Sequence, residues 1–286
     1  MPIYLCPVCS KPLKQDPCRF VCEKGHSFDR SRSGYVNLLL PNEKHSKLPG
    51  DNKIMVRARQ EFLNAGYYQP LCRALCMALI RLCASQKGQC IHVLDAGCGE
   101  GYYTTQIAQA LWQADIMAEI SGVDISKFAL DKAARKNSQI TYAVASIFHL
   151  PVADQSLDLL LNLFAPYCNE EFARVLRPGG LMALVIPGEA HLWELKQTVY
   201  DQPYRNTVKG YELDGFTLQE KQEVSTVIHL RSQKDIDNLF KMTPYYYKTS
   251  EQGYRRISQL DTLDTQIQFE SLFYRKNINN PEPFQV

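Results

Sequence analysis

The sequence predicts an α/β protein with a doubly wound, mostly parallel sheet and a small cysteine-rich module in front of it. Three observations predict this fold. Segments of strand and helix character alternate from residue 91 to residue 187, a glycine-rich turn follows the first strand, and four cysteines and one histidine lie within residues 6–26. Strands that are joined by helical crossovers run parallel in one sheet. The 286 residues allow one large domain with a smaller element or a second domain.

The elements can be assigned in chain order. A helix is predicted over 53–65, capped by Asp51 or Asn52 and followed by Gly66, and a second helix begins near Pro70. Strands are predicted over 91–94, 120–123, 140–144, 157–161 and 181–186, with helices over 103–111, 126–136 and 170–176. Beyond residue 187, 190–200 has helical character, 205–265 is mixed, and 265–274 alternates like one strand of a late pair at the sheet edge.

The turn after the first predicted strand is the candidate cofactor site. Its glycines follow a G-x-G-x-G pattern, one residue tighter than the dinucleotide fingerprint, and are Gly97, Gly99 and Gly101. Glycine lets a ligand lie close to the backbone, while Asp95 and Glu100 offer negative charge to an amino group and a sulfonium. The pattern resembles motif I of class I S-adenosylmethionine (SAM) methyltransferases.

Four further segments stand at the spacing of that family. Asp124 ends the second strand, where a carboxylate can accept hydrogen bonds from two ribose hydroxyls, and Ser146 follows the third strand, where the family contacts adenine. Segments 150–158 and 174–180 resemble the turns into strands four and five. Five matches in order argue against unrelated turns and helix caps. The resemblance implies a Rossmann-like, mostly parallel sheet of seven strands that binds SAM.

The N-terminal segment predicts a zinc site. Cys6-x2-Cys9 is followed by Cys22-x3-His26, and each pair can ligate one side of a tetrahedral zinc ion. Cys18 is an alternative ligand, but we prefer Cys22 and His26 because their spacing is typical of a zinc knuckle. Free thiols in a loop without metal are the other interpretation. A metal would also fold a segment that has little core of its own.

Composition and charge narrow the function further. Residues 1–60 carry eleven Lys and Arg against five Asp and Glu, which fits a polyanionic partner or, equally, a solvated basic face. We expect no membrane span because no run of about 18 apolar residues occurs. Ten cysteines, and an N-terminus without a secretory pattern, favour a reducing compartment, which we expect to be the cytoplasm.

The whole chain resembles the bacterial 23S rRNA guanine-N1 methyltransferases of the RlmA type. Besides the zinc and glycine motifs, the resemblance is carried by segments 26–29, 34–39, 49–51, 57–68, 187–195 and 242–244. It implies SAM-dependent methylation of guanine N1 in a hairpin loop of 23S rRNA, by a homodimer whose zinc modules help to form the RNA-binding cleft. Its cofactor contacts map onto Tyr68, the turn 99–102 with Tyr102, and His191.

The acceptor pocket should lie at the carboxyl end of the fourth strand, in segment 162–167. Asn162 or the backbone near Ala165 and Pro166 could orient a guanine edge, and Phe164 or Tyr167 could stack on the base. Core packing is an equal alternative for both rings. The residue that removes the N1 proton is not identified from the sequence.

We expect three regions: a zinc-binding RNA-recognition module over 1–36, a connector with helices over 37–90, and a methyltransferase domain over 91–286 with a variable region near 188–262. Two alternatives remain at this stage. One is a methyltransferase for small molecules, for which a basic zinc module is not expected. The other is a non-catalytic assembly factor that binds SAM and RNA.

Overall fold

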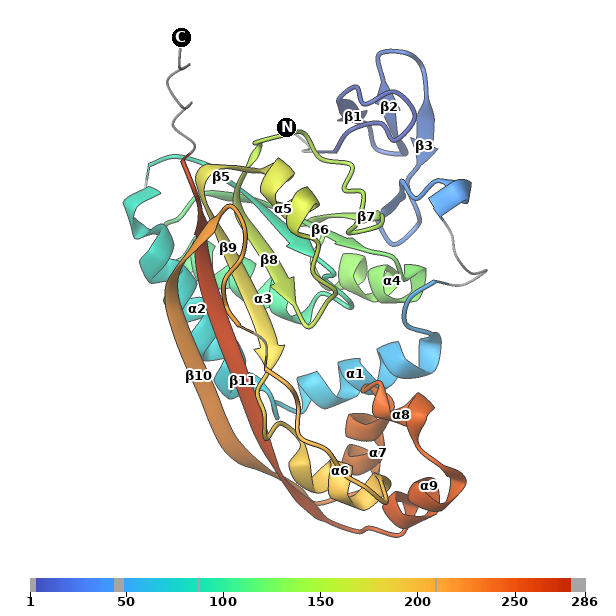
Figure 1. Cartoon of the computed structure of the whole chain (residues 1–286). Helices are drawn as coiled ribbons and strands as arrows, with labels where there is room; N and C mark the ends of the chain where they lie inside the picture. The colour runs from blue at the N-terminus through green and yellow to red at the C-terminus, as the bar shows by residue number, and fades with distance from the viewer. Residues whose placement is uncertain (1–3, 44–48, 87, 209, 279–286) are drawn as a thin grey trace.

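The computed structural model describes residues 4–43, 49–86, 88–208 and 210–278. The fold consists of a three-stranded N-terminal module, a large sheet flanked by helices and a lower group of helices (Figure 1). Lys44 and Lys47 of the basic N-terminal set, with the part of the connector around them, lie outside the described residues.

The central sheet has the strand order β10-β11-β9-β8-β5-β6-β7-β4. Its strands are β4 (Val36–Asn37), β5 (Ile91–Ala96), β6 (Ala118–Asp124), β7 (Thr141–Val144), β8 (Leu157–Leu163), β9 (Leu176–Pro187), β10 (Phe216–Leu230) and β11 (Leu263–Lys276). Neighbours from β4 to β9 pair in parallel, and β11 pairs antiparallel with both β9 and β10. The predicted fold class is confirmed. The strand number differs, because the two residues of β4 add an eighth strand beside β7.

Helices cover the sheet in two unequal layers. One face packs against α1 (Lys53–Asn64), α2 (Gln69–Cys83), α3 (Tyr102–Gln113) and α4 (Lys127–Lys136). The other face packs against α5 (Asn169–Val175) and against buried residues of the N-terminal module. Asn52 rather than Asp51 caps α1, since its side chain accepts hydrogen bonds from the N–H groups of Ile54 and Met55.

The late part of the chain contributes both to the sheet and to a cap of helices. The predicted late strand pair is present as β10 and β11, and β10 lies in the range that the sequence left mixed. The cap consists of α6 (Trp193–Val199), α7 (Gln233–Lys241), α8 (Tyr245–Lys248) and α9 (Glu251–Ser258), which lie with α1 below the sheet (Figure 1). Its helix α7 packs mainly on α1, so the connector and the cap form one roof.

The N-terminal module is a small antiparallel sheet of β1 (Leu13–Gln15), β2 (Arg19–Cys22) and β3 (Ser27–Asp29). Tyr4 ties it to the central sheet: its buried hydroxyl lies 2.9 and 3.0 Å from the carbonyl oxygens of Gly122 and Thr141 and shares its one proton between them. Because a buried hydroxyl without a partner is costly, these two bonds fix where the module docks.

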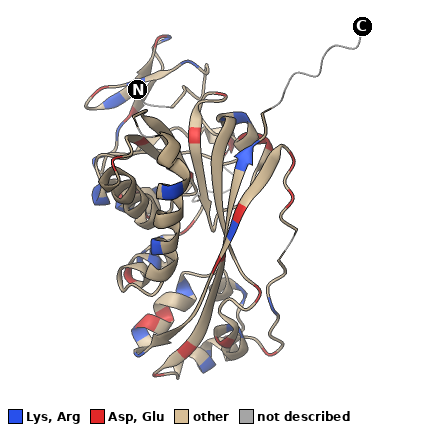
Figure 2. Cartoon of the chain, turned by 90° about the vertical axis from the view of Figure 1, so that its left-hand side faces the viewer, with Lys and Arg blue, Asp and Glu red and all other residues tan. Residues whose placement is uncertain are grey.

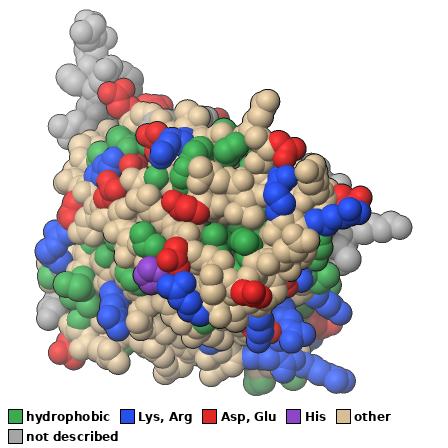
Figure 3. Space-filling view, turned by 90° about the horizontal axis from the view of Figure 1, so that it is seen from below, with side chains coloured by type: hydrophobic (Ala, Val, Ile, Leu, Met, Phe, Trp, Pro, Cys, Tyr) green, Lys and Arg blue, Asp and Glu red, His purple; other side chains and the backbone are tan. Residues whose placement is uncertain are grey.

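The charged side chains are dispersed rather than gathered on one element. Lys and Arg alternate with Asp and Glu on the helices of the cap (Figure 2), and from below both signs lie among separate hydrophobic side chains (Figure 3). Ion pairs such as Arg57 with Glu61 and Arg255 with Glu251 account for part of this pattern. None of the described helices is long and apolar enough to cross a membrane.

Candidate functional site

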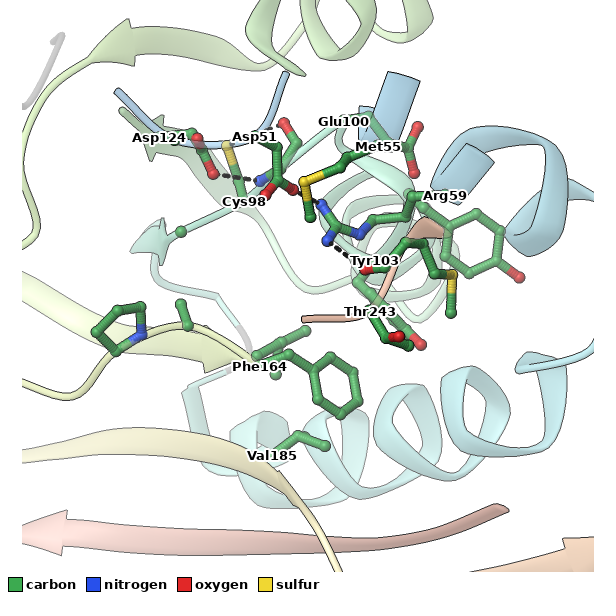
Figure 4. A pocket seen from close by; sticks show the side chains of 18 of the residues that line it. Asp51, Met55, Arg59, Cys98, Glu100, Tyr103, Asp124, Phe164, Val185 and Thr243 are labelled. Carbon is green, nitrogen blue, oxygen red and sulfur yellow. Dashed lines mark hydrogen bonds and ion pairs between the residues drawn. The ribbon is translucent and has the colours of Figure 1, made fainter. Parts of the chain in front are cut away.

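A pocket of about 690 Å³ opens at the carboxyl edge of the parallel strands. Its floor is the β5–α3 turn and the ends of β6, β8 and β9, and its roof is the inner face of α1 with residues 242–245 of the cap (Figure 4). Loops at this edge of an open α/β sheet are where ligands bind in such folds. The pocket is therefore where the predicted cofactor and acceptor groups can be compared.

The glycine turn leaves bare backbone against the pocket. Gly97, Gly99 and Gly101 all have positive φ, of 92°, 55° and 77°, which L-residues with a Cβ adopt at a cost. A Cβ on Gly97 would stand 2.4 Å from the Cβ of Ala165, across the floor of the pocket. Gly97 and Gly99 line the pocket, whereas Gly101 faces α4, where a Cβ would come within 2.9 Å of Ala133.

Asp95 is a buried carboxylate with one free oxygen. It is 1% exposed and accepts a hydrogen bond from the Thr104 hydroxyl at 2.6 Å, while Oδ1 has no partner within the described chain. Burial raises the pKa of Asp95 to about 7. An ammonium group in the pocket would satisfy the free oxygen and favour the ionised form, so the site fits the amino group of SAM.

The other two acidic residues have different surroundings. Asp124 accepts from the N–H groups of Gly99 and Ser126 at 2.9 and 2.8 Å, and burial raises its pKa. Glu100 is paired with Lys136, so its charge is offset inside the protein rather than offered whole to a sulfonium. Its other oxygen, Oε1, is buried without a partner in the described structure, so the expectation that Glu100 offers negative charge to the ligand stays a prediction.

Tyr68, Tyr102, Ser146 and His191 also line the pocket. Tyr68 and His191 both pack against the ring of Phe269, at 4.8 and 4.5 Å between ring centroids. Burial, with a contribution from Lys196, lowers the pKa of His191 to about 3. Its Nδ1 accepts from the backbone N–H of Gln268 at 3.3 Å, which assigns the ring proton to Nε2. The neutral ring can therefore donate to a ligand.

The acceptor segment divides into residues that reach the pocket and residues that do not. Phe164, Ala165 and Pro166 line it, whereas Asn162 and Tyr167 are absent from its walls. The Asn162 amide donates to the carbonyl oxygens of Ala96 and Pro166, both at 3.0 Å, so it shapes the turn instead of facing an acceptor. The expectation that Asn162 could orient guanine is therefore wrong.

Tyr167 packs 5.3 Å from the ring of Phe172 and donates its hydroxyl to Asn169, which rules it out as a stacking surface in this pocket. Phe164 is the aromatic side chain of the segment that the pocket exposes. It is 43% exposed and has a φ of 59°, a left-handed conformation that is strained for a bulky residue. Strained residues that persist are over-determined by their surroundings and cluster at functional sites.

Sequence reasoning missed the roof of the pocket. Asp51, Met55 and Arg59 approach from the connector, and Met242 and Tyr245 from the cap. Apart from Tyr68, residues 49–51, 57–68 and 242–244 stood out only as matching segments, without a role. The helical spacing of Met55, Arg59 and Leu63 was the available signal, since residues four apart share one face of a helix.

The four predicted metal ligands lie together in the N-terminal module. The ligand atoms of Cys6, Cys9, Cys22 and His26 are all within 4.8 Å of one another, and Cys18 is exposed and outside the group. The Cys9 and Cys22 sulfurs are 3.7 Å apart, close to the edge of about 3.8 Å of a tetrahedron with Zn–S bonds of about 2.3 Å. The donor set and its spacing therefore fit zinc.

The chain folds locally so as to present these ligands. Gly25 has a φ of 82° and its N–H bonds the Cys22 carbonyl oxygen at 2.9 Å, which turns the chain back after β2. The Cys22 N–H then bonds the His26 carbonyl oxygen at 3.1 Å. Sγ of Cys22 and Nδ1 of His26 end 3.4 Å apart. A tight turn with glycine at the left-handed position is what brings C-x3-H onto one side of a metal.

Two family models match the chain. Residues 4–47 match the model described as RlmA, N-terminal, and residues 88–243 match a methyltransferase domain. The two segments divide the described structure at the connector, with the Cys–His cluster in the first and the pocket floor in the second.

Three curated relatives are similar over most of the chain. A protein of Micromonospora griseorubida with the provisional name 23S rRNA (guanine-N(1)-)-methyltransferase is 39% identical over 210 residues, or 68% of this chain and 69% of the relative. The 23S rRNA (guanine(748)-N(1))-methyltransferase of Streptomyces fradiae is 37% identical over 66% of this chain and 65% of its own. A Bacillus subtilis protein with the same provisional name is 28% identical over 96% of this chain and 97% of its own.

Proposed function

The chain belongs to the 23S rRNA (guanine-N1)-methyltransferase family, and we propose that it transfers a methyl group from SAM to N1 of a guanine in a hairpin loop of 23S rRNA. One observation carries the proposal. The bare glycine turn, the half-satisfied buried carboxylate of Asp95 and the partly exposed ring of Phe164, whose backbone is left-handed, line the same pocket. A cationic donor and a planar acceptor can therefore meet there.

The floor of the pocket is proposed to hold the cofactor. When bound, SAM supplies a methyl group on a sulfonium that is already activated. The backbone at Gly97 and Gly99 accommodates the methionine part, Asp95 accepts from its amino group, and Asp124 accepts from the ribose hydroxyls. Tyr68, Ser146 and the Nε2 proton of His191 complete the contacts. Because the donor is activated, positioning supplies much of the rate.

Phe164 is proposed to stack on the guanine after it leaves the RNA loop. Stacking of a base on an aromatic side chain contributes about 1–3 kcal/mol, enough to hold a base out of a loop. The N1 proton of guanine must also be removed. His191 cannot take it, because Nδ1 already accepts a hydrogen bond and Nε2 carries the proton. Tyr103 stays protonated, since burial raises its pKa well above the usual value.

The zinc module is proposed to bind the RNA beside this pocket. Its basic surplus and its docking through Tyr4 onto the sheet support that role. The family resemblance adds that two copies of the chain form a homodimer with the RNA between their modules. The three cysteines of the site must stay out of disulfides to bind a metal, and a reducing environment favours this, which supports a cytoplasmic location.

The test is methyl transfer from labelled SAM to 23S rRNA transcribed in vitro, followed by digestion to nucleosides. We expect 1-methylguanosine as the labelled product, at one position in a hairpin loop. Label in small molecules but not in RNA would favour a small-molecule methyltransferase. SAM and RNA binding without transfer would favour a non-catalytic assembly factor. Either result would contradict the proposal.

A further inference from the structure

The charges around the pocket are unequal. Four carboxylates line it, those of Asp51, Asp95, Glu100 and Asp124, and among its described lining residues Arg59 alone is Lys or Arg. Since His191 is neutral, Arg59 is the positively charged residue among the described residues that line the pocket. SAM itself carries one carboxylate besides its ammonium and sulfonium. Asp51 and Glu100 are already paired with Arg59 and Lys136, whereas Asp95 has an oxygen without a partner among the described residues and suits the ammonium. The SAM carboxylate needs a different partner.

Arg59 is built into the roof with part of its guanidinium still available. It forms an ion pair with Asp51 and donates to the carbonyl oxygen of Met242 at 3.2 Å. A guanidinium has five N–H donors, and these two bonds are the ones found for it within the described chain. Figure 4 shows it pointing across the pocket between the Asp51 and Thr243 sides. Two anchors hold the group in place without exhausting it.

A polar group without a partner among the described residues, the buried hydroxyl of Tyr103, also lines the pocket (Figure 4). Arg59 is close enough to counter part of the rise that burial causes in the pKa of Tyr103. A buried hydroxyl that is left unpaired costs about 1–3 kcal/mol, so a ligand acceptor between the two groups would relieve a real penalty.

We propose that Arg59 and Tyr103 hold the carboxylate of the methionine part of SAM, with Asp51 as the positioning residue for Arg59. The two charged groups of the methionine part then bind residues of opposite charge: Asp95 binds the ammonium, and Arg59 binds the carboxylate. This inference rests on the proposed function only for the identity of the cofactor. Because Arg59 also bonds Met242, the same contact joins the connector and the cap over the bound cofactor.

The test compares SAM with decarboxylated SAM, which lacks this one group, by calorimetry without RNA. The unsubstituted protein should bind SAM about 10- to 100-fold more tightly than decarboxylated SAM, as expected for a charge-assisted pair. In Arg59→Gln that ratio should fall to about one or below. In Tyr103→Phe it should fall by less, because a neutral hydroxyl contributes less than a guanidinium.

Arg57→Gln is the matched control. Arg57 lies on the same helix, is 79% exposed and pairs with Glu61 away from the pocket, so its loss should keep the ratio. Two results would overturn the proposal. One is an unchanged ratio in Arg59→Gln because both ligands weaken equally, and the other is an unchanged SAM affinity with a raised KM for RNA in the transfer assay. The second result would assign Arg59 to the guanine. Failure of the proposed function would appear separately, as normal SAM binding without 1-methylguanosine.

Discussion

The zinc module and the cofactor pocket are held together by different physics. The module has three short strands and a small buried group around Leu13 and Phe20, and its shape depends on four side chains that converge on one point. The pocket stands on strands whose residues are almost fully buried, such as the seven of β8. Metal binding stabilises the fold of the zinc module, and hydrophobic burial stabilises the sheet that carries the pocket. Damage to one should therefore spare the other.

The largest expected effect comes from removing a metal ligand. Cys22→Ser should lower the zinc content and reduce methyl transfer to RNA by about 100-fold or more, because the module loses the interaction that folds it. SAM affinity should stay within about twofold, since the pocket lies in the central sheet. Metal analysis and calorimetry measure the two effects on one sample.

Cys18→Ser is the control for that experiment, because Cys18 is exposed and outside the ligand group. It should keep zinc and activity. If Cys22→Ser lost SAM binding in parallel with zinc, the two regions would not be independent and the comparison would fail.

The second prediction is the opposite case, a change in the glycine turn that should weaken SAM binding and leave the zinc module intact. Gly97→Ala would put a Cβ 2.4 Å from that of Ala165, so the turn and the acceptor segment must move apart. We expect SAM binding to weaken by about 30- to 100-fold with zinc retained.

Gly179→Ala is matched in backbone strain, with a φ of 73°, but a Cβ there meets nothing within 4 Å. It should cost stability and leave SAM affinity unchanged. Equal loss of SAM affinity in both variants would mean that strain, rather than the approach to Ala165, explains the result.

A smaller effect should distinguish the proposed acceptor side of the pocket, at Phe164, from the side that binds the cofactor. Phe164→Leu keeps an apolar side chain and removes the ring, so turnover of RNA should fall by about 5- to 30-fold, or about 1–2 kcal/mol. SAM affinity should be unchanged. Tyr167→Phe should alter neither quantity, because its ring lies against Phe172. Turnover that falls with Tyr167→Phe and not with Phe164→Leu would reverse the assignment.

The effect that is smallest near neutral pH is a pH dependence of cofactor binding. Below pH 7 Asp95 of the free protein holds a proton, because its pKa is raised to about 7 by burial. The ammonium of SAM favours the ionised form, so binding must expel that proton. Affinity should therefore fall below pH 7 by up to about tenfold per pH unit and level off above it.

Calorimetry in buffers of different ionisation enthalpy should detect the released proton. Asp95→Asn should flatten the dependence between pH 5.5 and 7. His191 does not contribute in this range, since its pKa is about 3. An unchanged slope in Asp95→Asn would assign the proton to another group, such as Asp124.

The alternating part of the fold was predictable because each strand there is apolar and bounded by a helix. The edges were not. β10 carries polar residues at most positions and is exposed along most of its length, so it lacks the period that marks a half-buried strand. The two residues of β4 are too few to show any period, and their parallel pairing with β7 places them in the sheet.

The site residues were predictable where a sequence motif indicates the chemistry. They were unpredictable where tertiary packing determines which side chains face the pocket. The glycine pattern predicts a bound cofactor and the Cys–His spacing predicts a bound metal, without knowledge of the fold. The choice between Phe164 and Tyr167 depends on a left-handed turn that nothing in the sequence signals. Arg59 reaches the pocket because α1 packs on α7. These two helices are about 180 positions apart in the chain, so the sequence near Arg59 does not show this contact.

The most direct measurement is a crystal structure of the chain with S-adenosylhomocysteine, the product of the transfer. The account predicts the homocysteine part along the bare backbone at Gly97 and Gly99, its amino group on Asp95, and its sulfur facing Phe164. Density for the ligand in any other place, with this turn empty, would contradict the central claim.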